Sequence, residues 1–178
     1  MITSYISDKA KIGKNVIIGH FCVIEEGVVI GDNVIIEHHN ILKKGVVIGE
    51  NTVIKSYVEL REDTIIGKDC YVDSKVSSSG NCSVGNNTSL RYGTILARGV
   101  KIGNNCYLCP RVMTNNLDDE MSSIGGAHIG DNCFIGTHSV LQYGITLEEG
   151  VIIGSMAFVN KDCKKNTTYI GIPAKPIR

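Results

Sequence analysis

The sequence predicts an all-β fold, a parallel β-helix of hexapeptide repeats, and three observations carry this prediction. Aliphatic residues recur every six positions, at 17 of the 18 places from Ile6 to Leu108. The turn residues between them repeat with a period of 18. The series stops once and then resumes in register at Ile129. A period of six suits neither an amphipathic helix nor an alternating strand, and it is typical of a β-helix in which each hexad forms a short strand and a turn.

Each hexad is expected to turn two residues inward: the aliphatic anchor and, four positions later, a small residue such as Val28 or Thr52. Six of the seven cysteines fall at this small position, where a free thiol acts as a small apolar filler. These six are Cys22, Cys70, Cys82, Cys106, Cys133 and Cys163. The pattern favours reduced thiols over a disulfide framework, and therefore a cytosolic compartment.

The residue three positions after each anchor marks a corner, and three corners make one coil of 18 residues. The first set is Asn15, Asn33, Asn51, Asp69, Asn87 and Asn105; the second is Lys9, Gly27, Gly45, Asp63, Asn81 and Gly99. Asn, Asp and Gly tolerate left-handed backbone dihedrals, so these two corners are expected to turn tightly. The third set mostly lacks these residue types and carries bulky or charged side chains: Phe21, His39, Tyr57, Lys75, Gly93 and Arg111.

The break in the series sets the domain plan. The corner columns realign if nine residues are inserted before Ile129. We therefore predict a β-helix over residues 1–164, with an inserted loop at about 114–128, and an extended C-terminal tail over 165–178. An insertion in a solenoid often marks the binding face. Ser78 interrupts the aliphatic series within Ser77–Gly80 and predicts a local distortion of its coil.

Composition excludes several classes of protein. The 178 residues hold 18 Lys and Arg against 18 Asp and Glu, with no basic stripe, which argues against a nucleic-acid partner. No apolar stretch is long enough to span a membrane. The N-terminus lacks a basic region followed by an apolar run, so no secretory signal is expected. A cytoplasmic protein without a membrane partner is the prediction.

Three features of the chain resemble the hexapeptide-repeat acyltransferases: the hexads from Ile6 to Cys163, the segment Val112–Asn116 and the ending Ile170–Lys175. The resemblance implies a left-handed parallel β-helix; the handedness comes from it alone, because the general crossover rule favours a right-handed coil. The Val-x-Thr-Asn segment is most similar to N-acetyltransferases that act on nucleotide-linked amino sugars. Such enzymes are homotrimers with acyl-CoA between the C-terminal coils of adjacent subunits. The resemblance thus implies an acyl-CoA-dependent enzyme, without a metal, in surface-glycan biosynthesis.

Carried over position by position, the resemblance places acyl-CoA along the last coils and the tail. The implied residues are Gly136, Ser155, Ala157, Asn160, Lys161, Pro173, Lys175 and Arg178. Their cations suit the phosphates of CoA, and a merely solvated tail is the alternative. The family often has Gly-Ala-Gly where this chain has Gly154-Ser-Met-Ala, so Met156 is expected to reshape the pantetheine groove.

The start of the loop bears on the reaction. Related O-acetyltransferases carry a histidine base in or near this loop, whereas the matching positions here are Asn115 and Asn116. A hydroxyl acceptor needs a positioned base and a neutral amine does not, so N-acylation is favoured. Asn115 is expected to orient the amine or donate to the oxyanion, with a turn-forming Asn as the alternative. His138 at the third corner and His128 at the end of the loop are further catalytic candidates, although solvent contact alone is an alternative for a loop histidine. A zinc site is disfavoured, because the five histidines lack the spacing of a three-histidine site.

The acceptor is expected to bind just N-terminal to the loop. Arg61 and Arg91 are candidates for a nucleotide diphosphate, and an aromatic ring or a carboxylate for the base and the sugar amine. The substrate candidates are Tyr57, Glu59, Arg61, Asp73, Ser79, Arg91 and Tyr92. A surface ladder of solvated charges is the alternative for each. Two other functions stay open: an O-acetyltransferase for a small hydroxylated acceptor, and a non-enzymatic β-solenoid scaffold. The acyl group, the nucleotide carrier and the position of the amine are not decided by the sequence.

Overall fold

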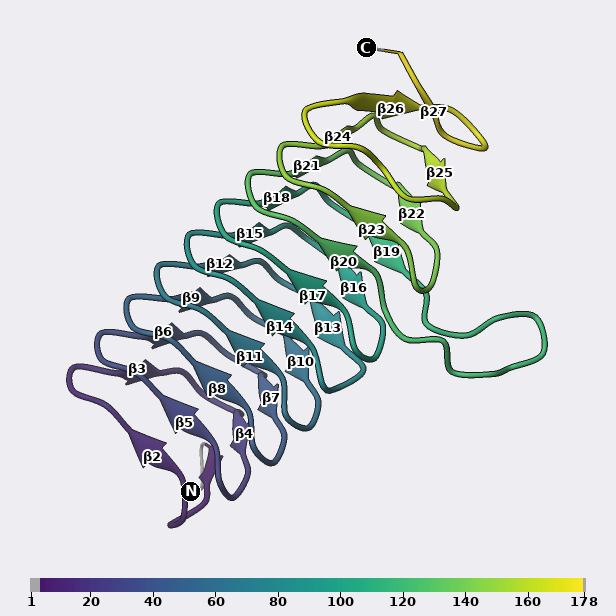
Figure 1. Cartoon of the computed structure of the whole chain (residues 1–178). Coiled ribbons are helices and arrows are strands. Elements are labelled where there is room, and N and C mark those ends of the chain that lie inside the picture. The colour runs from purple at the N-terminus through teal and green to yellow at the C-terminus, as the bar shows by residue number, and fades with distance from the viewer. Residues whose placement is uncertain (1–3, 178) are drawn as a thin grey trace.

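The computed structural model describes residues 4–177, and these form a left-handed parallel β-helix with three sheets along its sides. Each coil contributes one two-residue strand to each sheet, and the coils stack along one axis (Figure 1). The prediction of an all-β helix of hexapeptide repeats is confirmed.

Sheet A contains the first strand of each coil. Its strands are β1 (Tyr5–Ile6), β4 (Val23–Ile24), β7 (Ile41–Leu42), β10 (Glu59–Leu60), β13 (Ser77–Ser78), β16 (Ile95–Leu96), β19 (Met113–Thr114), β22 (Val140–Leu141) and β25 (Phe158–Val159). Sheet B contains β2 (Lys11–Ile12), β5 (Val29–Ile30), β8 (Val47–Ile48), β11 (Ile65–Ile66), β14 (Ser83–Val84), β17 (Lys101–Ile102), β20 (His128–Ile129) and β23 (Thr146–Leu147).

Sheet C closes the triangle and includes the C-terminal segment. Its strands are β3 (Ile17–Ile18), β6 (Ile35–Ile36), β9 (Val53–Ile54), β12 (Tyr71–Val72), β15 (Ser89–Leu90), β18 (Tyr107–Leu108), β21 (Phe134–Ile135), β24 (Ile152–Ile153), β26 (Thr168–Ile170) and β27 (Lys175–Pro176). β26 pairs parallel with β24, and β27 returns antiparallel to β26. The segment for which an extended tail is predicted thus forms a hairpin against the last coil.

The anchors fill the core. Ile24, Leu60 and Leu108 are completely buried. The small inward residues Thr52 and Val58 are at most 1% exposed. Backbone N–H groups donate to carbonyl oxygens of the next coil. The N–H of Ile35, for example, donates to the carbonyl of Thr52 at 3.1 Å. Burial and a complete ladder explain why two-residue strands suffice.

Ser78 does not distort its coil. β13 pairs in regular register with β10 and β16, so the expected distortion is wrong. The Ser78 hydroxyl lies 2.8 Å from the hydroxyl of Thr64 and accepts from the backbone N–H of Arg61 at 3.1 Å. These bonds satisfy the buried oxygen, so a polar anchor is accommodated without a change of backbone.

Left-handed backbone dihedrals recur along all three corners, with exceptions such as Lys9 and Asp162 at the A–B corner of the terminal coils. The corner between sheets C and A, hereafter the C–A corner, adopts them with side chains that disfavour them: φ is 59° at Phe21, 63° at Tyr57 and 61° at Lys75. The prediction that only two of the corners turn tightly is therefore wrong. The prediction that the third corner carries bulky or charged side chains is right. Steric strain of this kind is retained where the side chain has a role.

The inserted loop leaves the three-sided stack of coils, hereafter the prism, between sheets A and B, at the A–B corner (Figure 1). It runs from the end of β19 at Thr114 to the start of β20 at His128. Leu117 and Ser123 form an antiparallel bridge, and the Asp118 carboxylate accepts from the Ser122 N–H at 2.7 Å. No helix within residues 4–177 is long and apolar enough to cross a bilayer.

Candidate active site

Asn115 lies at the base of the loop, directly after the end of strand β19 of sheet A. Its Nδ2 donates to Oε1 of Gln142 on the next coil at 2.9 Å, and its backbone N–H donates to the carbonyl of Leu141. Together these bonds hold the amide against the prism. A pocket of about 360 Å³ adjoins Asn115; its lining residues are Ser79, Ile95, Ala97, Thr114, Asn115, Asn116 and Leu117. The pocket therefore offers amide and hydroxyl groups and no acid or base.

His138 occupies the C–A corner, at the other edge of sheet A from Asn115. A pocket of about 460 Å³ lies beside it, with Ile95 and Met113 from the face of sheet A and Arg111 and Lys75 from the corner. Tyr92, Gly93 and Val112 complete the lining. Ile95 also lines the Asn115 pocket, so the two pockets share this side chain across the face of the sheet.

His128 is separate from both. It is the exposed first residue of β20 on sheet B, in register with Lys101 and Thr146. The pocket it lines contains none of the residues around Asn115 or His138. The structure thus does not bring His128 together with the other catalytic candidates.

Both arginines predicted for a diphosphate are engaged by carboxylates. Arg61 Nε donates to Glu59 at 3.0 Å. Arg91 Nε lies 3.3 Å from Asp73, and the Arg91 guanidinium is 5.3 Å from the ring centre of Tyr71. Four of the predicted substrate residues therefore form two ion pairs, Arg61 with Glu59 and Arg91 with Asp73, in which the charges compensate each other.

Tyr57 belongs to a column of stacked rings on the C–A corner. Its ring lies 4.8 Å from that of His39 with planes 2° apart, and His39 lies 4.9 Å from Phe21. Tyr57 and Phe21 are 58% and 63% exposed. The column presents aromatic surface to solvent just N-terminal to the His138 pocket.

Residues predicted to contact acyl-CoA gather at the C-terminal end. Asn160, Lys161, Pro173 and Lys175 line one pocket of about 420 Å³, with Tyr169 as a further wall. Asp162 also lines this pocket, but among the described residues neither lysine lies within 4.0 Å of a carboxylate, so both ammonium groups are available to phosphates.

The other implied CoA residues lie nearby on the last coils. Ser155 and Met156 are exposed at the corner, whereas the Ala157 side chain is buried and leaves only its backbone to a ligand. A Cβ at Gly136 would lie 2.4 Å from the backbone nitrogen of Ser155, so the coil itself requires glycine there. Arg178 lies outside the described residues.

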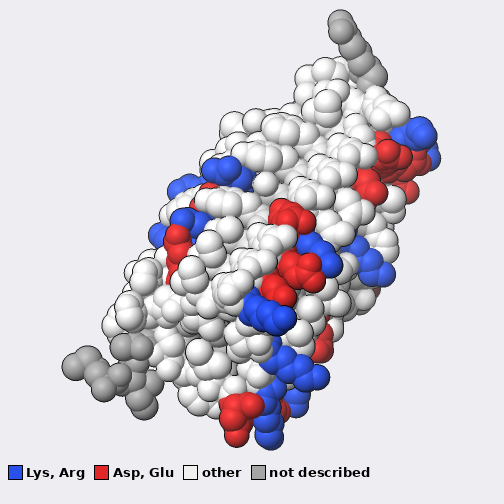
Figure 2. Space-filling model, turned by 90° about the vertical axis from the view of Figure 1, so that its left-hand side faces the viewer, with Lys and Arg blue, Asp and Glu red and all other residues white. Residues whose placement is uncertain are grey.

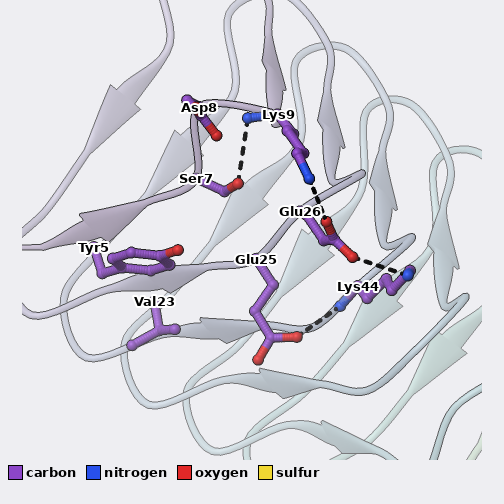
Figure 3. A pocket seen from close by; sticks show the side chains of 8 residues that line it. All are labelled: Tyr5, Ser7, Asp8, Lys9, Val23, Glu25, Glu26 and Lys44. Atoms are coloured by element: carbon purple, nitrogen blue, oxygen red, sulfur yellow. Dashed lines mark hydrogen bonds and ion pairs between the residues drawn. The ribbon is translucent and has the colours of Figure 1, made fainter.

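The N-terminal coils hold a further pocket, of about 450 Å³ (Figure 3). Glu26 accepts from Lys44 at 2.9 Å and from Lys9 at 3.2 Å, and Glu25 accepts from Lys43 at 2.7 Å. The hydrogen bond from Lys43 lowers the pKa of Glu25, and that from Lys44 lowers the pKa of Glu26. The lysines and glutamates here are thus paired with one another, whereas Asp8, which also lines the pocket, has no ion pair among the described residues.

Paired charges are common elsewhere on the surface. On the face that Figure 2 shows, Lys and Arg lie beside Asp and Glu in narrow lines, with wide uncharged surface between. The cysteines are buried and free, and burial raises the pKa of Cys163 to about 12. Burial likewise raises the pKa of Cys70 and Cys82, so these thiols stay neutral and are poor nucleophiles. Among residues 4–177, no group of three His, Cys, Asp or Glu side chains is placed to hold a metal ion.

The sequence matches three family models, two of which describe hexapeptide repeats. Residues 2–81 match the GMPPB C-terminal domain, 80–110 the hexapeptide repeat of succinyl-transferase, and 126–161 the bacterial transferase hexapeptide (six repeats). These matches support a hexapeptide-repeat acyltransferase. This confirms the family that the hexads, the loop and the ending indicate.

Two curated relatives come from Escherichia coli. The dTDP-4-amino-4,6-dideoxy-D-glucose acyltransferase is 35% identical over 89 residues, which cover 48% of this chain and 46% of that protein. The galactoside O-acetyltransferase of strain K12 is 31% identical over 88 residues, which cover 44% and 43% of the two chains. The chain thus spans less than half the length of these relatives in the matched region.

Solved structures show the same fold. The UDP-N-acetylglucosamine acyltransferase from Bacteroides fragilis superimposes with a TM-score of 0.87 at 24% identity, over 99% of this chain and 72% of that one. The enzyme of that name from Campylobacter jejuni gives 0.86 at 18% identity, over 99% and 73%.

Three residues of the candidate site were not proposed from the sequence as site residues: Gln142, Lys75 and Arg111. Gln142 follows Asn115 by 27 residues, one coil plus the insertion, so column arithmetic would have found it. Lys75 and Arg111 were placed at the correct corner. Their lack of ion-pair partners has no signal in the sequence, because it depends on which carboxylates the coils bring within reach.

Proposed function

We propose that the protein transfers an acyl group, acetyl by preference, from acyl-CoA to the amino group of a nucleotide-linked amino sugar in surface-glycan biosynthesis. The observation that carries this proposal is the Asn115 pocket, whose lining holds no titratable side chain. A hydroxyl acceptor needs a base there, and a neutral amine does not. The amine-specific reaction therefore suits the pocket.

The reaction needs one tetrahedral intermediate. The amine nitrogen attacks the thioester carbonyl carbon, a C–N bond forms, and the C–S bond then breaks. CoA leaves as the thiol and takes up the proton that the nitrogen loses. Asn115 has two amide hydrogens, and Gln142 accepts one of them, which leaves the other for the developing oxyanion. The proposal gives Asn115 this role and His138 the positioning of the acceptor.

The donor site is proposed at the C-terminal pocket. Lys161 and Lys175 lie there without carboxylate partners, and the pocket is large enough for part of a nucleotide. Bound acyl-CoA would supply the activated thioester carbonyl. By analogy with the resemblance, we propose a cytoplasmic homotrimer in which adjacent C-terminal coils share the donor.

The curated relatives bear on the choice between an amine and a hydroxyl acceptor. One curated relative is named as an acyltransferase of a dTDP-linked amino sugar. Another is named as an O-acetyltransferase, so the hydroxyl acceptor is the alternative that the experiment has to test.

The test is release of CoA thiol from acetyl-CoA in the presence of matched acceptors. dTDP- and UDP-linked amino sugars are compared with the same nucleotides carrying a hydroxyl in place of the amine. We expect release with an amino sugar only, and a fall in kcat of about 100-fold for Asn115→Ala. The melting-temperature shift with CoA should stay unchanged in that variant.

Asp119→Asn is the matched control, because Asp119 is an exposed residue of the same loop. It should retain full turnover. Equal release with the hydroxyl acceptor, or no release with any acceptor, would overturn the proposal. Unchanged kcat in Asn115→Ala would remove Asn115 from the mechanism.

A further inference from the structure

We propose that a notch at Gly93 on the C–A corner binds the diphosphate of the nucleotide-linked acceptor, through Lys75 and Arg111. The identity of the acceptor rests on the proposed function; the anion site rests on the geometry that follows. Neither cation was among the residues that the sequence suggested for a diphosphate.

The notch is a gap in an otherwise continuous ridge of side chains. Along this corner the described residues are Phe21, His39, Tyr57, Lys75, Gly93, Arg111, His138 and Met156. Gly93 alone has no side chain, and a Cβ built there would meet only Arg111 Cγ, at 3.5 Å. Space for a ligand is therefore open at this one coil of the ridge.

Two uncompensated cations flank the gap. Arg111 lies one coil after Gly93 and Lys75 one coil before, about 4.8 Å away on each side at the usual strand spacing. Within residues 4–177 neither has a carboxylate within 4.0 Å, whereas neighbouring Arg91 is paired with Asp73. The Lys75 ammonium lies 5.5 Å from the ring centre of Tyr92, a contact that leaves its positive charge uncompensated. Two such cations either side of an open site suit a diphosphate, which carries negative charge on the oxygens of both phosphates.

The long side chains at this corner stand on a backbone conformation that disfavours them. φ is 61° at Lys75, 59° at Arg111 and 58° at His138, in a region that disfavours long side chains. The other two corners mostly place Asn, Asp or Gly in this conformation. The fold imposes this backbone along all three corners, so the C–A corner differs in bearing long and charged side chains there in spite of the strain.

The surroundings match the rest of such a ligand in order. On the C-terminal side of the notch, His138 and the apolar surface of Ile95 and Met113 line the same pocket and can receive the sugar. On the N-terminal side, Tyr57 exposes an aromatic ring one coil before Lys75, where a nucleobase can stack. Sugar, diphosphate and base thus meet suitable groups along one line.

CoA also contains a diphosphate, so the experiment must separate the two nucleotides. Binding of dTDP, UDP and CoA is measured by calorimetry on the wild-type protein, Lys75→Ala, Arg111→Ala and Gly93→Asn. Asparagine tolerates the left-handed backbone at Gly93 and fills the gap. We expect each variant to weaken binding of dTDP or UDP about tenfold and to change CoA affinity less than twofold.

Matched controls make the same changes away from the notch. Lys14→Ala and Arg98→Ala remove exposed cations that have no ion pair among the described residues, and Gly27→Asn changes a glycine of similar φ at the A–B corner. These controls should bind dTDP and UDP like the wild type. Wild-type nucleotide affinity in all three notch variants, loss of CoA affinity alone, or no nucleotide binding by the wild type would overturn the inference.

Turnover separates this inference from the proposed function. If the wild type binds the nucleotide through the notch but releases no thiol with any amino sugar, the proposed function fails and the site stands. If acyl transfer proceeds and the notch variants keep the KM for the acceptor, the site fails and the proposed function stands.

Discussion

Two pockets beside sheet A use cations in opposite ways. In the N-terminal pocket, Lys9 and Lys44 both bind Glu26 (Figure 3), and Lys43 beside the pocket binds Glu25. At the Gly93 notch, Lys75 and Arg111 have no carboxylate partner among the described residues. The coils beneath the two pockets have the same strand pairing.

The difference shows what the solenoid fixes and what it leaves free. Anchors and ladders are alike in both regions, so the framework does not determine which charges compensate each other. Exposed ion pairs add little to stability, and their main consequence is that the cations are occupied. A pocket's size is therefore a poorer guide to ligand binding than the state of its charges.

The largest expected effect tests whether the two regions share one framework. Leu42 and Leu96 are both completely buried anchors of sheet A, Leu42 near the N-terminal pocket and Leu96 near the notch. Leu42→Ala and Leu96→Ala should each lower the free energy of unfolding by about 2–5 kcal/mol, measured by urea denaturation. A loss in one variant with none in the other would contradict a uniform core.

A smaller effect tests the strain at the C–A corner. Met156 has φ of 59° and is 68% exposed, outside the notch. Met156→Asn should raise the free energy of unfolding by about 1 kcal/mol, because Asn tolerates this backbone. Met156→Leu keeps the same strain and should leave the stability unchanged. Equal stabilities of the Asn and Leu variants would show that the corner is not strained.

A change of charge should make the N-terminal pocket resemble the notch. In Glu25→Gln/Glu26→Gln the lysines that these carboxylates bind are released. Binding of inorganic pyrophosphate to this pocket, followed by NMR shifts of the Gly27 amide, should strengthen about threefold, as expected for removal of weak exposed ion pairs. Unchanged binding would mean that pairing does not control access to these cations.

The smallest effect is a pH dependence confined to the N-terminal pocket. The pKa of Glu25 is lowered in the folded protein, first by the hydrogen bond from Lys43. A lowered folded-state pKa stabilises the protein above the unfolded value of about 4.3, and this contribution disappears as the pH falls through the folded value. The wild type should therefore melt slightly above the Gln double variant at pH 7 and lose that margin near pH 3. A margin that grows on acidification would contradict the sign.

Much of the fold could be predicted because its period is carried by side chains that must be buried. Ile24 and Leu108 follow the hexad rule, and the insertion before Ile129 was found from the shift in register. Handedness came from the resemblance alone. The backbone at Tyr57 was missed, since the corner geometry overrides what a tyrosine prefers.

The candidate site could be predicted by position but not by charge state. Asn115 and Tyr92 lie in pockets, and four of the expected CoA residues line a third. Arg61 and Arg91 are paired with Glu59 and Asp73, which the sequence did not indicate. Pairing depends on side chains from adjacent coils and on which rotamers meet, which spacing along the chain does not encode.

The most direct measurement is an NMR titration of labelled protein with dTDP and UDP, following the amides of Gly93 and Gly27. The two glycines have φ of 67° and 72° and lie on different corners, so each reports on one region. We expect saturable shifts at Gly93 with one nucleotide and none at Gly27. Shifts at Gly27 alone, or at neither glycine, would contradict the claim that the notch is the nucleotide site.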